Sequence, residues 1–172
     1  DAMQSSSTYG NWDFIDTWRI IGESYPRLSW FAGSLAEVVV KTASLEDFVY
    51  DGNEKMPAVN SVTLYETALD EGTDYTISYQ NNVNAGTAII SICGIGAYSG
   101  CKLVSFEISP VNVAASIAAI DNQVYSGDSI APNISVLVAD TVISPIDYRL
   151  IYTNNINAGK GSVQVVLTGN YS

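Results

Sequence analysis

The stretch DYTISYQNNVNAG, residues 74–86, decides the fold because the chain contains it twice. Residues 147–159 read DYRLIYTNNINAG, and residues 74–99 share 11 of 26 positions with residues 147–172 without a gap. Chance does not produce agreement of this length. Self-similarity at a fixed period indicates a repeated structural unit, so the sequence predicts two copies of one module.

Matches earlier in the chain set the limits of the two copies. Tyr50 recurs as Tyr125 at a spacing of 75, whereas the later matches have a spacing of 73. We therefore expect one two-residue deletion between the two blocks. The predicted domains are a leading segment at 1–35, a first module at 36–109 and a second module at 110–172.

Within each copy the side chains follow the period of a β-strand. Residues 73–79 alternate between apolar and polar, and Gly, Asn, Asp and Pro clusters separate several such runs. Short strands with regular turn signals favour an all-β fold of two tandem Ig-like β-sandwich modules. A β-grasp-like fold is the alternative and requires a helix near Ala-rich residues 113–120. We expect a strand there, because the matching residues 38–40 are all valine.

The second copy is one strand shorter than the first. Residues 101–109 alternate from Leu103 onward and read as a strand, but Ser172 matches Ser99 and nothing in the sequence corresponds to 101–109. An unpaired strand edge promotes aggregation, so we expect the natural chain to continue and supply this strand. The alternative is a dimer formed through the exposed strand edges.

An asparagine-rich segment is the best-matched feature of both copies. It contains Asn81, Asn82, Asn84 and Gly86 in the first copy, and Asn154, Asn155, Asn157 and Gly159 in the second. Asn and Gly tolerate positive φ angles, so we interpret the segment as a structural turn. The alternative is a calcium loop using Asp70, Glu71 and Asp74. Ile143 and Ser144 stand opposite the first two acids, which weakens the calcium hypothesis.

The two cysteines flank a predicted turn. Cys93 and Cys101 are separated by a Gly-rich segment, and a hairpin at this position brings them within disulfide reach. We predict a disulfide, which agrees with an oxidising, extracellular setting. Two buried thiols are the alternative.

Composition argues against several function classes. The chain has 18 acidic and 7 basic residues, a net charge of −11 and no histidine. The negative charge opposes binding to nucleic acid, and no apolar run is long enough for membrane insertion. Without histidine the chain lacks the commonest general base and zinc ligand. Acid pairs such as Glu46-Asp47 do not recur between copies. We therefore expect no enzyme, no cofactor and no metal site.

The leading segment carries every tryptophan of the chain. Trp12, Trp18 and Trp30 lie among further aromatic residues that have no counterpart in the repeats. We expect a hydrophobic cap on the first module, since aromatic clusters serve in packing. The alternative is an aromatic binding face that stacks on sugars.

Two resemblances follow from these residues. Met3, Ser6, Trp12-Asp13-Phe14, Trp18 and Tyr25-Pro26-x-Leu28-x-Trp30 resemble the closing segment of GLUG-type repeat proteins of bacterial surfaces. The modules resemble a tandem family of bacterial surface modules with the pattern Tyr-x-Gly, Pro, Asp-Tyr, Tyr-x-Asn-Asn-x-Asn-Ala-Gly, Gly-x-Tyr-Ser-Gly and Phe-x-Ile. Both resemblances imply an extracellular or cell-surface location.

The resemblance implies a structural function. We expect tandem spacer modules of a secreted or surface-attached protein, as in the stalk of an adhesin, in contact with neighbouring modules of the same chain. One alternative is a module that binds polysaccharide or host matrix, with Tyr65, Tyr75 and Tyr79 in a stacking face. Another is an accessory region of a surface peptidase or glycosidase.

Overall fold

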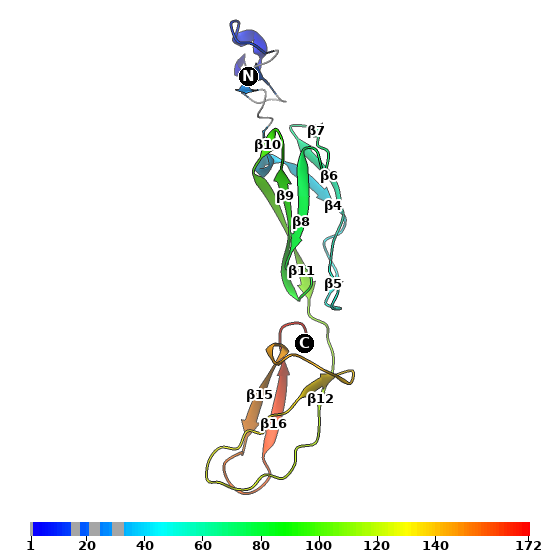
Figure 1. Cartoon of the computed structure of the whole chain (residues 1–172), viewed down its shortest axis with the longest axis vertical. Coiled ribbons are helices and arrows are strands. Elements are labelled where there is room, and N and C mark those ends of the chain that lie inside the picture. Colours follow the sequence, from blue (N-terminus) through cyan, green and yellow to red (C-terminus); the bar gives the residue numbers. More distant parts are fainter. Residues whose placement is uncertain (1, 15–17, 21–24, 29–32) are drawn as a thin grey trace. The chain divides into compact units, whose positions relative to one another are not determined.

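The computed structural model describes residues 2–14, 18–20, 25–28 and 33–172. These residues form an all-β structure with several sheets, which confirms the predicted sandwich-type fold class (Figure 1). In the described residues, helical structure is limited to four short 3-10 turns: η1 (Ala2–Gln4), η2 (Ser6–Thr8), η3 (Leu35–Glu37) and η4 (Pro145–Asp147). The Ala-rich segment contains strand β12 (Ala115–Ile117), so the helix required by the β-grasp alternative is not formed there.

The chain divides into two compact units. The first unit comprises Asp1–Glu46, Glu54–Asn82 and Thr87–Glu107, and the second comprises Asp47–Asn53, Val83–Gly86 and Ile108–Ser172. Two short segments of the first sequence repeat therefore belong to the second unit. The domain limits given above stay a prediction.

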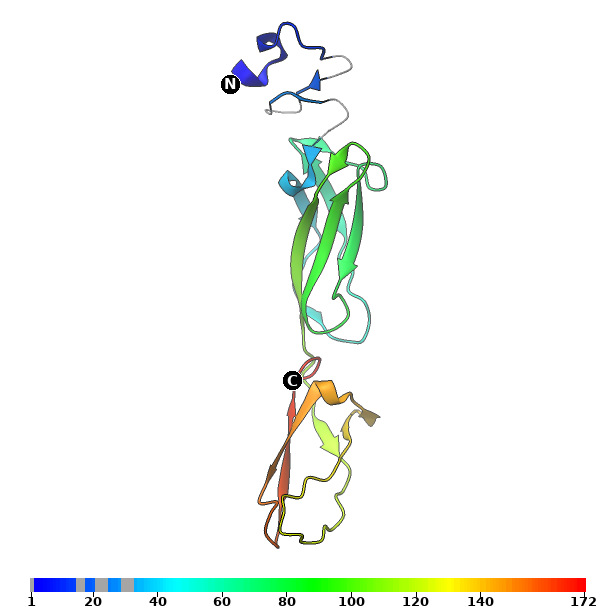
Figure 2. The same cartoon turned by 60° about the vertical axis from the view of Figure 1, so that its left-hand side comes forward.

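The first repeat contains two main sheets, which Figure 2 shows as separate layers. One has the order β4–β6–β7 and the other β5–β11–β9–β8. Their strands are β4 (Val39–Thr42), β5 (Phe48–Val49), β6 (Val59–Leu64), β7 (Thr67–Ala68), β8 (Tyr75–Gln80), β9 (Gly86–Gly94) and β11 (Cys101–Ser109). A short parallel pair, β3 (Gly33–Ser34) with β10 (Tyr98–Ser99), lies at the start of the repeat.

The core of the first repeat comes from alternate residues of these strands. Ala88, Ile90 and Ile92 on β9 have no exposed surface. Val62 and Leu64 on β6 are each 1% exposed. This two-residue period is the pattern of a strand with one buried face, and it places the apolar side chains between the two layers.

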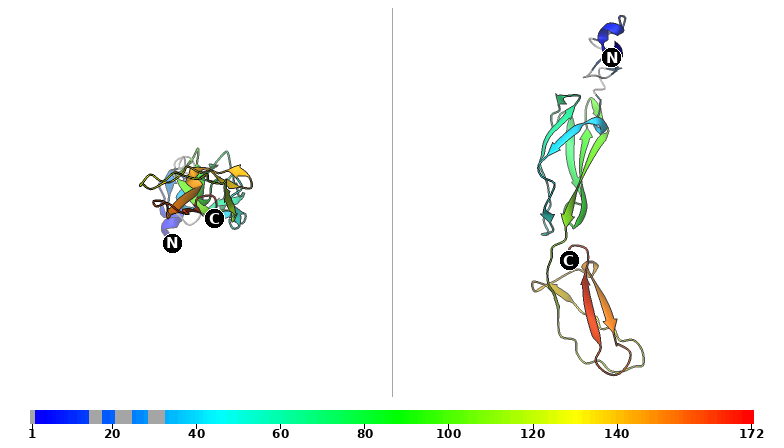
Figure 3. Two further views of the ribbon diagram at one scale, coloured as in Figure 1. Left: turned by 90° about the horizontal axis from the view of Figure 1, so that it is seen from below. Right: turned by 180° about the vertical axis from the view of Figure 1, so that it is seen from behind.

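The second repeat has the same strand order with fewer strands. Its sheets are β12–β13–β14 and β15–β16, where β13 is Val136–Val138, β14 is Thr141–Val142, β15 is Tyr148–Thr153 and β16 is Ser162–Leu167 (Figure 3). Tyr148 pairs with Leu167 as Tyr75 pairs with Gly94, so the two hairpins have the same register. No strand of the described residues takes the position that β11 has in the first repeat.

The same hydrogen bonds recur in both repeats and align them. The Tyr79 hydroxyl donates to the carbonyl of Pro57 at 2.7 Å, and the Tyr152 hydroxyl donates to that of Pro132. The amide of Leu69 donates to the Val62 carbonyl as that of Ile143 donates to Val136, which is a spacing of 74. Between Pro57 and Asp74 the repeats therefore differ by two single-residue deletions, one at 57–62 and one at 69–74. The expected single two-residue deletion is wrong.

Outside the repeats, the leading segment has little regular structure in its described part. β1 (Trp18–Arg19) pairs antiparallel with β2 (Arg27–Leu28). The remaining described residues contain η1 and η2.

Candidate functional site

The asparagine-rich segments form the turns between β8 and β9 and between β15 and β16. Asn81 has a φ of 55° and Asn154 a φ of 54°, while Gly86 and Gly159 have φ values of 126° and 140°. These backbone angles favour Asn and Gly over other residues. The positive φ angles therefore explain why the motif begins with Asn81 or Asn154 and ends with Gly86 or Gly159.

The second asparagine of each motif anchors a neighbouring segment. In the first repeat, Asn82 Nδ2 donates to the carbonyl of Lys55 at 3.1 Å, and the Lys55 amide donates to the Asn82 carbonyl at 2.7 Å. In the second, Asn155 Nδ2 donates to the Ile130 carbonyl at 3.0 Å, and the Ile130 amide donates back at 2.8 Å. Each pair of reciprocal bonds joins two segments as paired residues of neighbouring strands are joined in a β-sheet. Asn82 and Asn155 therefore have a structural role.

The third asparagine has a different partner, which the sequence did not suggest. Asn170 Oδ1 accepts a hydrogen bond from the Ala85 amide at 2.8 Å, and Asn170 Nδ2 donates to Asn84 Oδ1 at 3.2 Å. All three residues belong to the second compact unit. A loop of the first sequence repeat is therefore bound by a turn of the second.

Two further groups surround Asn170. The Asn170 amide donates to Oδ1 of Asp147 at 3.1 Å, and Asp147 is only 6% exposed. The next residue, Tyr171, packs edge-to-face on Tyr50, with ring centroids 5.6 Å apart. Burial, followed by the neighbouring Tyr50 and Asp147, raises the pKa of the Tyr171 hydroxyl. The cluster of Tyr50, Asn84, Asp147, Asn170 and Tyr171 is called the junction cluster below.

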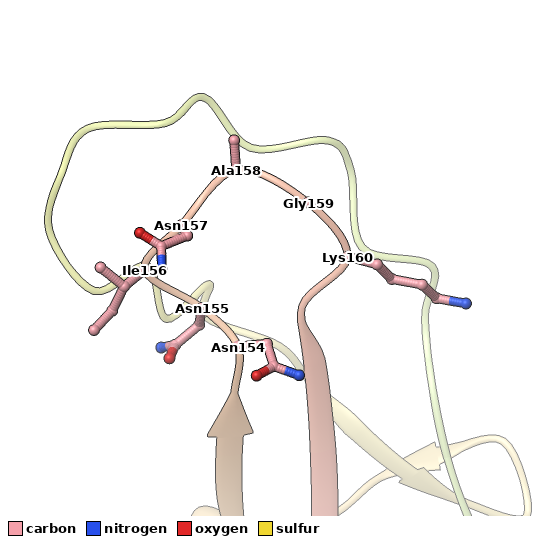
Figure 4. Close-up of a pocket in the computed structure, with 7 residues that line it drawn as sticks. All are labelled: Asn154, Asn155, Ile156, Asn157, Ala158, Gly159 and Lys160. Carbon is pink, nitrogen blue, oxygen red and sulfur yellow. The ribbon is translucent and has the colours of Figure 1, made fainter.

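The turn of the second repeat also lines a surface hollow (Figure 4). Its lining runs from Asn154 to Lys160, and the Lys160 side chain points away from the turn. These residues offer amide groups and one cation but no carboxylate. A second hollow, in the first unit, includes Glu54, Met56 and Tyr79.

Of the three acids of the calcium hypothesis, Asp74 has its carboxylate bonded to the backbone. Asp74 Oδ2 accepts a hydrogen bond from the Asp70 amide at 2.9 Å, which caps the turn before β8. Among the described residues, no group of three or more His, Cys, Asp or Glu side chains is placed to hold a metal ion. In the same part of the chain, no helix is long and apolar enough to cross a membrane.

Cys93 and Cys101 are joined by a disulfide across the hairpin of β9 and β11. Their Cα atoms are 4.1 Å apart, and the Gly94 amide donates to the Gly100 carbonyl at 2.9 Å beside them. The bridge closes a short loop, so it reinforces a turn that the backbone already forms.

Four aromatic residues of the leading segment, Tyr9, Trp12, Phe14 and Trp18, gather in one cluster. The ring centroids of Trp12 and Trp18 are 4.3 Å apart, and those of Tyr9 and Trp12 are 4.9 Å apart. Phe14 lies 6.4 Å from Trp12 in a stacked arrangement. Trp12 keeps 44% of its surface exposed. Trp30, the third residue of the predicted binding face, lies outside the described residues.

The tyrosines of the alternative stacking face do not form one exposed row. Tyr75 is 5% exposed, so its ring is not accessible to a sugar. The Tyr79 hydroxyl is bonded to Pro57, and the Tyr65 hydroxyl is bonded to Glu37. Burial, with smaller contributions from nearby acids, raises the pKa of Tyr75.

Comparisons with known proteins return no match. No family model matches the sequence, no curated protein is significantly similar to it, and no solved structure is significantly similar to its fold.

Proposed function

We propose that the chain is a non-catalytic spacer from a secreted or surface-attached bacterial protein, built from tandem Ig-like modules in the manner of an adhesin stalk. The observation that carries the proposal is the junction cluster. Asn170 makes two hydrogen bonds with residues 84 and 85 of the first repeat, and Tyr171 packs on Tyr50. A spacer requires consecutive modules to be joined, and these contacts hold parts of segments 47–53 and 83–86 of the first repeat within the second compact unit.

The repeated hydrogen bonds support the same proposal. The residues that the repeats share hold turns and anchor segments, as Asn82 and Asn155 do. The disulfide supports a location outside the cytoplasm, where such bonds persist. The resemblance to bacterial surface modules agrees with this location.

Hydrogen exchange of the Ala85 amide tests the proposal directly. This amide donates to Asn170 Oδ1, so we expect it to be protected from exchange in the wild-type chain. Removing the Asn170 amide group by Asn170→Ala deletes two hydrogen bonds, each worth about 1 kcal/mol. Exchange at Ala85 should then become at least about fivefold faster. Asn157→Ala is the matched control, because Asn157 is the counterpart of Asn84 in the second repeat. An unprotected Ala85 amide in the wild-type chain would contradict the spacer proposal.

A binding module is the second candidate, and the exposure of Trp12 favours it. An exposed indole within a cluster of rings is a suitable surface for stacking on a sugar or on host matrix. A glycan and matrix array tests this candidate with the wild-type chain and with Trp12→Ala and Trp18→Ala. Saturable binding that either substitution abolishes supports a binding module. An array without binding, with a folded protein, leaves the spacer or an accessory region of a surface enzyme.

A further inference from the structure

Strand β8 forms one edge of its sheet in the first repeat. In the order β5–β11–β9–β8 it pairs with β9, and no strand of the described residues pairs with its other side (Figure 1). The unpaired N–H and C=O groups of such an edge can pair with another extended chain. The outer side of β8 is therefore a candidate surface for strand addition.

The backbone groups of Ile77 and Tyr79 point toward this outer side. The Ile95 amide donates to the Asp74 carbonyl at 3.0 Å, so these two residues form a hydrogen-bonded pair next to the β8–β9 ladder. Hydrogen-bonded and non-hydrogen-bonded pairs alternate along antiparallel strands, and Ile77 and Tyr79 fall in the second kind. Within the described residues, their amides and carbonyls make no backbone bond on the outer side.

Backbone bonds close this stretch at both ends. Before it, the Gly72 amide donates to the Tyr75 carbonyl at 2.8 Å, and after it, the Lys55 amide donates to the Asn82 carbonyl at 2.7 Å. The stretch from Ile77 to Tyr79 is called the open edge below. It offers the donors and acceptors that a short added strand requires.

A hollow of about 560 Å³ lies against the open edge. This volume falls within the range of ligand-binding clefts. Met56, in the segment that leads into β6, is 60% exposed, so the hollow presents apolar surface to solvent. The hollow is lined by residues of β8, of the segment before β6 and of two loops: Glu54, Met56, Ala58, Val59, Glu71, Ile77, Ser78, Tyr79 and Asn82.

The charge of the hollow is negative. Of its lining residues, Glu54 and Glu71 are charged, and both are exposed. Neither acid forms an ion pair with any described residue. Burial, followed by the neighbouring Glu71, raises the pKa of the Tyr79 hydroxyl, which shows that the Glu71 charge acts on the hollow. A basic ligand would therefore complement these acids.

We propose that the open edge and the hollow form a docking site for a basic, extended segment of another protein. The segment adds to β8 as a further strand, with an apolar side chain against Met56 and basic side chains near Glu54 and Glu71. Main-chain hydrogen bonds give affinity in such strand addition, and side chains give specificity. A second copy of this chain is disfavoured, because its net charge is −11 and its own β8 edge carries the same acids. This site goes beyond the proposed spacer function, which requires no partner protein.

The second repeat offers an internal control. Its strand β15 pairs with β16 and is also the edge of its sheet. However, Ser129 and Ala131 stand in the places of Glu54 and Met56, and residues 144–146 supply no acid before β15. The edge of β15 therefore shares the backbone of the proposed site but lacks its charges and its methionine.

Peptide binding to the full chain, followed by NMR, tests the site. The probe is acetyl-Thr-Lys-Val-Thr-Val-Lys-Thr-amide, which is basic and rich in β-branched residues that favour a strand. We expect saturable shifts of the Ile77 and Tyr79 amides, whose exchange should become at least about tenfold slower. In the control peptide two prolines replace the central Thr-Val pair, which removes one N–H on each side of the extended chain. The control should bind at least about tenfold more weakly. Equal binding of the two peptides, or no binding of the probe, would overturn the proposal.

A pair of double variants tests the role of charge. Glu54→Gln with Glu71→Gln should weaken binding of the probe about 3- to 30-fold, as expected for two exposed ion pairs. Glu46→Gln with Glu66→Gln is the matched control, because it makes the same change in net charge at exposed acids outside the hollow. It should weaken binding less than about twofold.

Three further outcomes would overturn the docking site. The first is an equal loss of affinity in both double variants, because the acids of the hollow would then have no special role. The second is an equal affinity of the probe for the edges of β8 and β15. The third is protection of the open edge that rises with the concentration of the chain alone, because a second copy would then occupy it.

Discussion

Asn82→Ala distinguishes a structural turn from a binding loop. The Asn82 side chain is 9% exposed, and its amide donates to the Lys55 carbonyl at 3.1 Å. Alanine cannot make this bond, so a partly buried carbonyl loses its partner. Leaving such a group unsatisfied costs about 1–3 kcal/mol. The substitution should therefore lower the free energy of unfolding of the first repeat by this amount.

Hydrogen exchange measures this change for each repeat separately. In the native state, protected amides exchange through opening reactions whose free energy falls with stability. A loss of about 1–3 kcal/mol corresponds to an exchange rate about 5 to 150 times faster for the amides of β8 and β9. Asn155→Ala should have the same effect on β15 and β16.

Asn84→Ala is the matched control because it makes the same chemical change two residues later in the same turn. The Asn84 amide group bonds to Asn170 in the second compact unit. Exchange in β8 should therefore stay within about twofold of the wild-type rate, since a surface change of this kind has little effect on stability. If Asn82→Ala leaves the exchange rates of β8 and β9 unchanged, the structural interpretation of the motif is refuted.

Three other results are expected. Replacing Cys93 and Cys101 by Ser should lower the free energy of unfolding by about 2–3 kcal/mol, the value for a short closed loop, and equal urea midpoints with and without the bridge would contradict this. Gly169→Ala should destabilise the second repeat by about 1–3 kcal/mol more than Gly96→Ala destabilises the first. Both residues have positive φ, at 64° and 63°, but only the Cβ at 169 would lie 2.6 Å from a carboxylate oxygen. Burial of Tyr75 raises its folded pKa above the ordinary value of 10.0, so its stabilising contribution is complete below pH 10 and is lost as pH rises through the folded pKa. Circular dichroism at increasing pH should show this loss, and Tyr75→Phe should reduce it.

The repeat could be predicted from the sequence because its matches lie at positions with special backbone demands. Asn81 and Gly86 have positive φ, and few residues other than Asn and Gly adopt that conformation readily. Such residues leave a clear pattern in the sequence. The strand at Ala115–Ile117 could also be predicted, because the segment 113–120 was matched to residues 38–40, which are all β-branched valines.

The deletions between the repeats could not be placed from the sequence. Val62 and Leu69 correspond to Val136 and Ile143, but apolar residues are common in both copies and do not fix an alignment. Only a comparison of equivalent hydrogen bonds in the two repeats shows that there are two deletions of one residue each. The deletion at 69–74 lies between β7 and β8, where the backbone of a connection absorbs it. The deletion at 57–62 overlaps the start of β6.

The junction cluster also had no sequence signal. Asn170 replaces Ala97 of the first copy, so it appeared as a mismatch in the repeat. Its importance depends on a contact with Asn84, 86 residues away. A comparison of the two copies identifies the residues that they share. The contact between Asn170 and Asn84 depends instead on a position at which the copies differ.

Parallel strand pairs near the ends of the repeats have a mechanical consequence. In the first repeat β3 runs parallel to β10 and β5 runs parallel to β11, and in the second Val111 bridges Tyr171 in parallel. When the two strands of a parallel pair are pulled in opposite directions along their length, the hydrogen bonds between them are loaded together in shear. Antiparallel strands pulled from one end separate one bond at a time. A protein pulled along its chain would therefore meet its highest resistance at β3 and β5, and the first event of forced unfolding would be the simultaneous rupture of these short pairs.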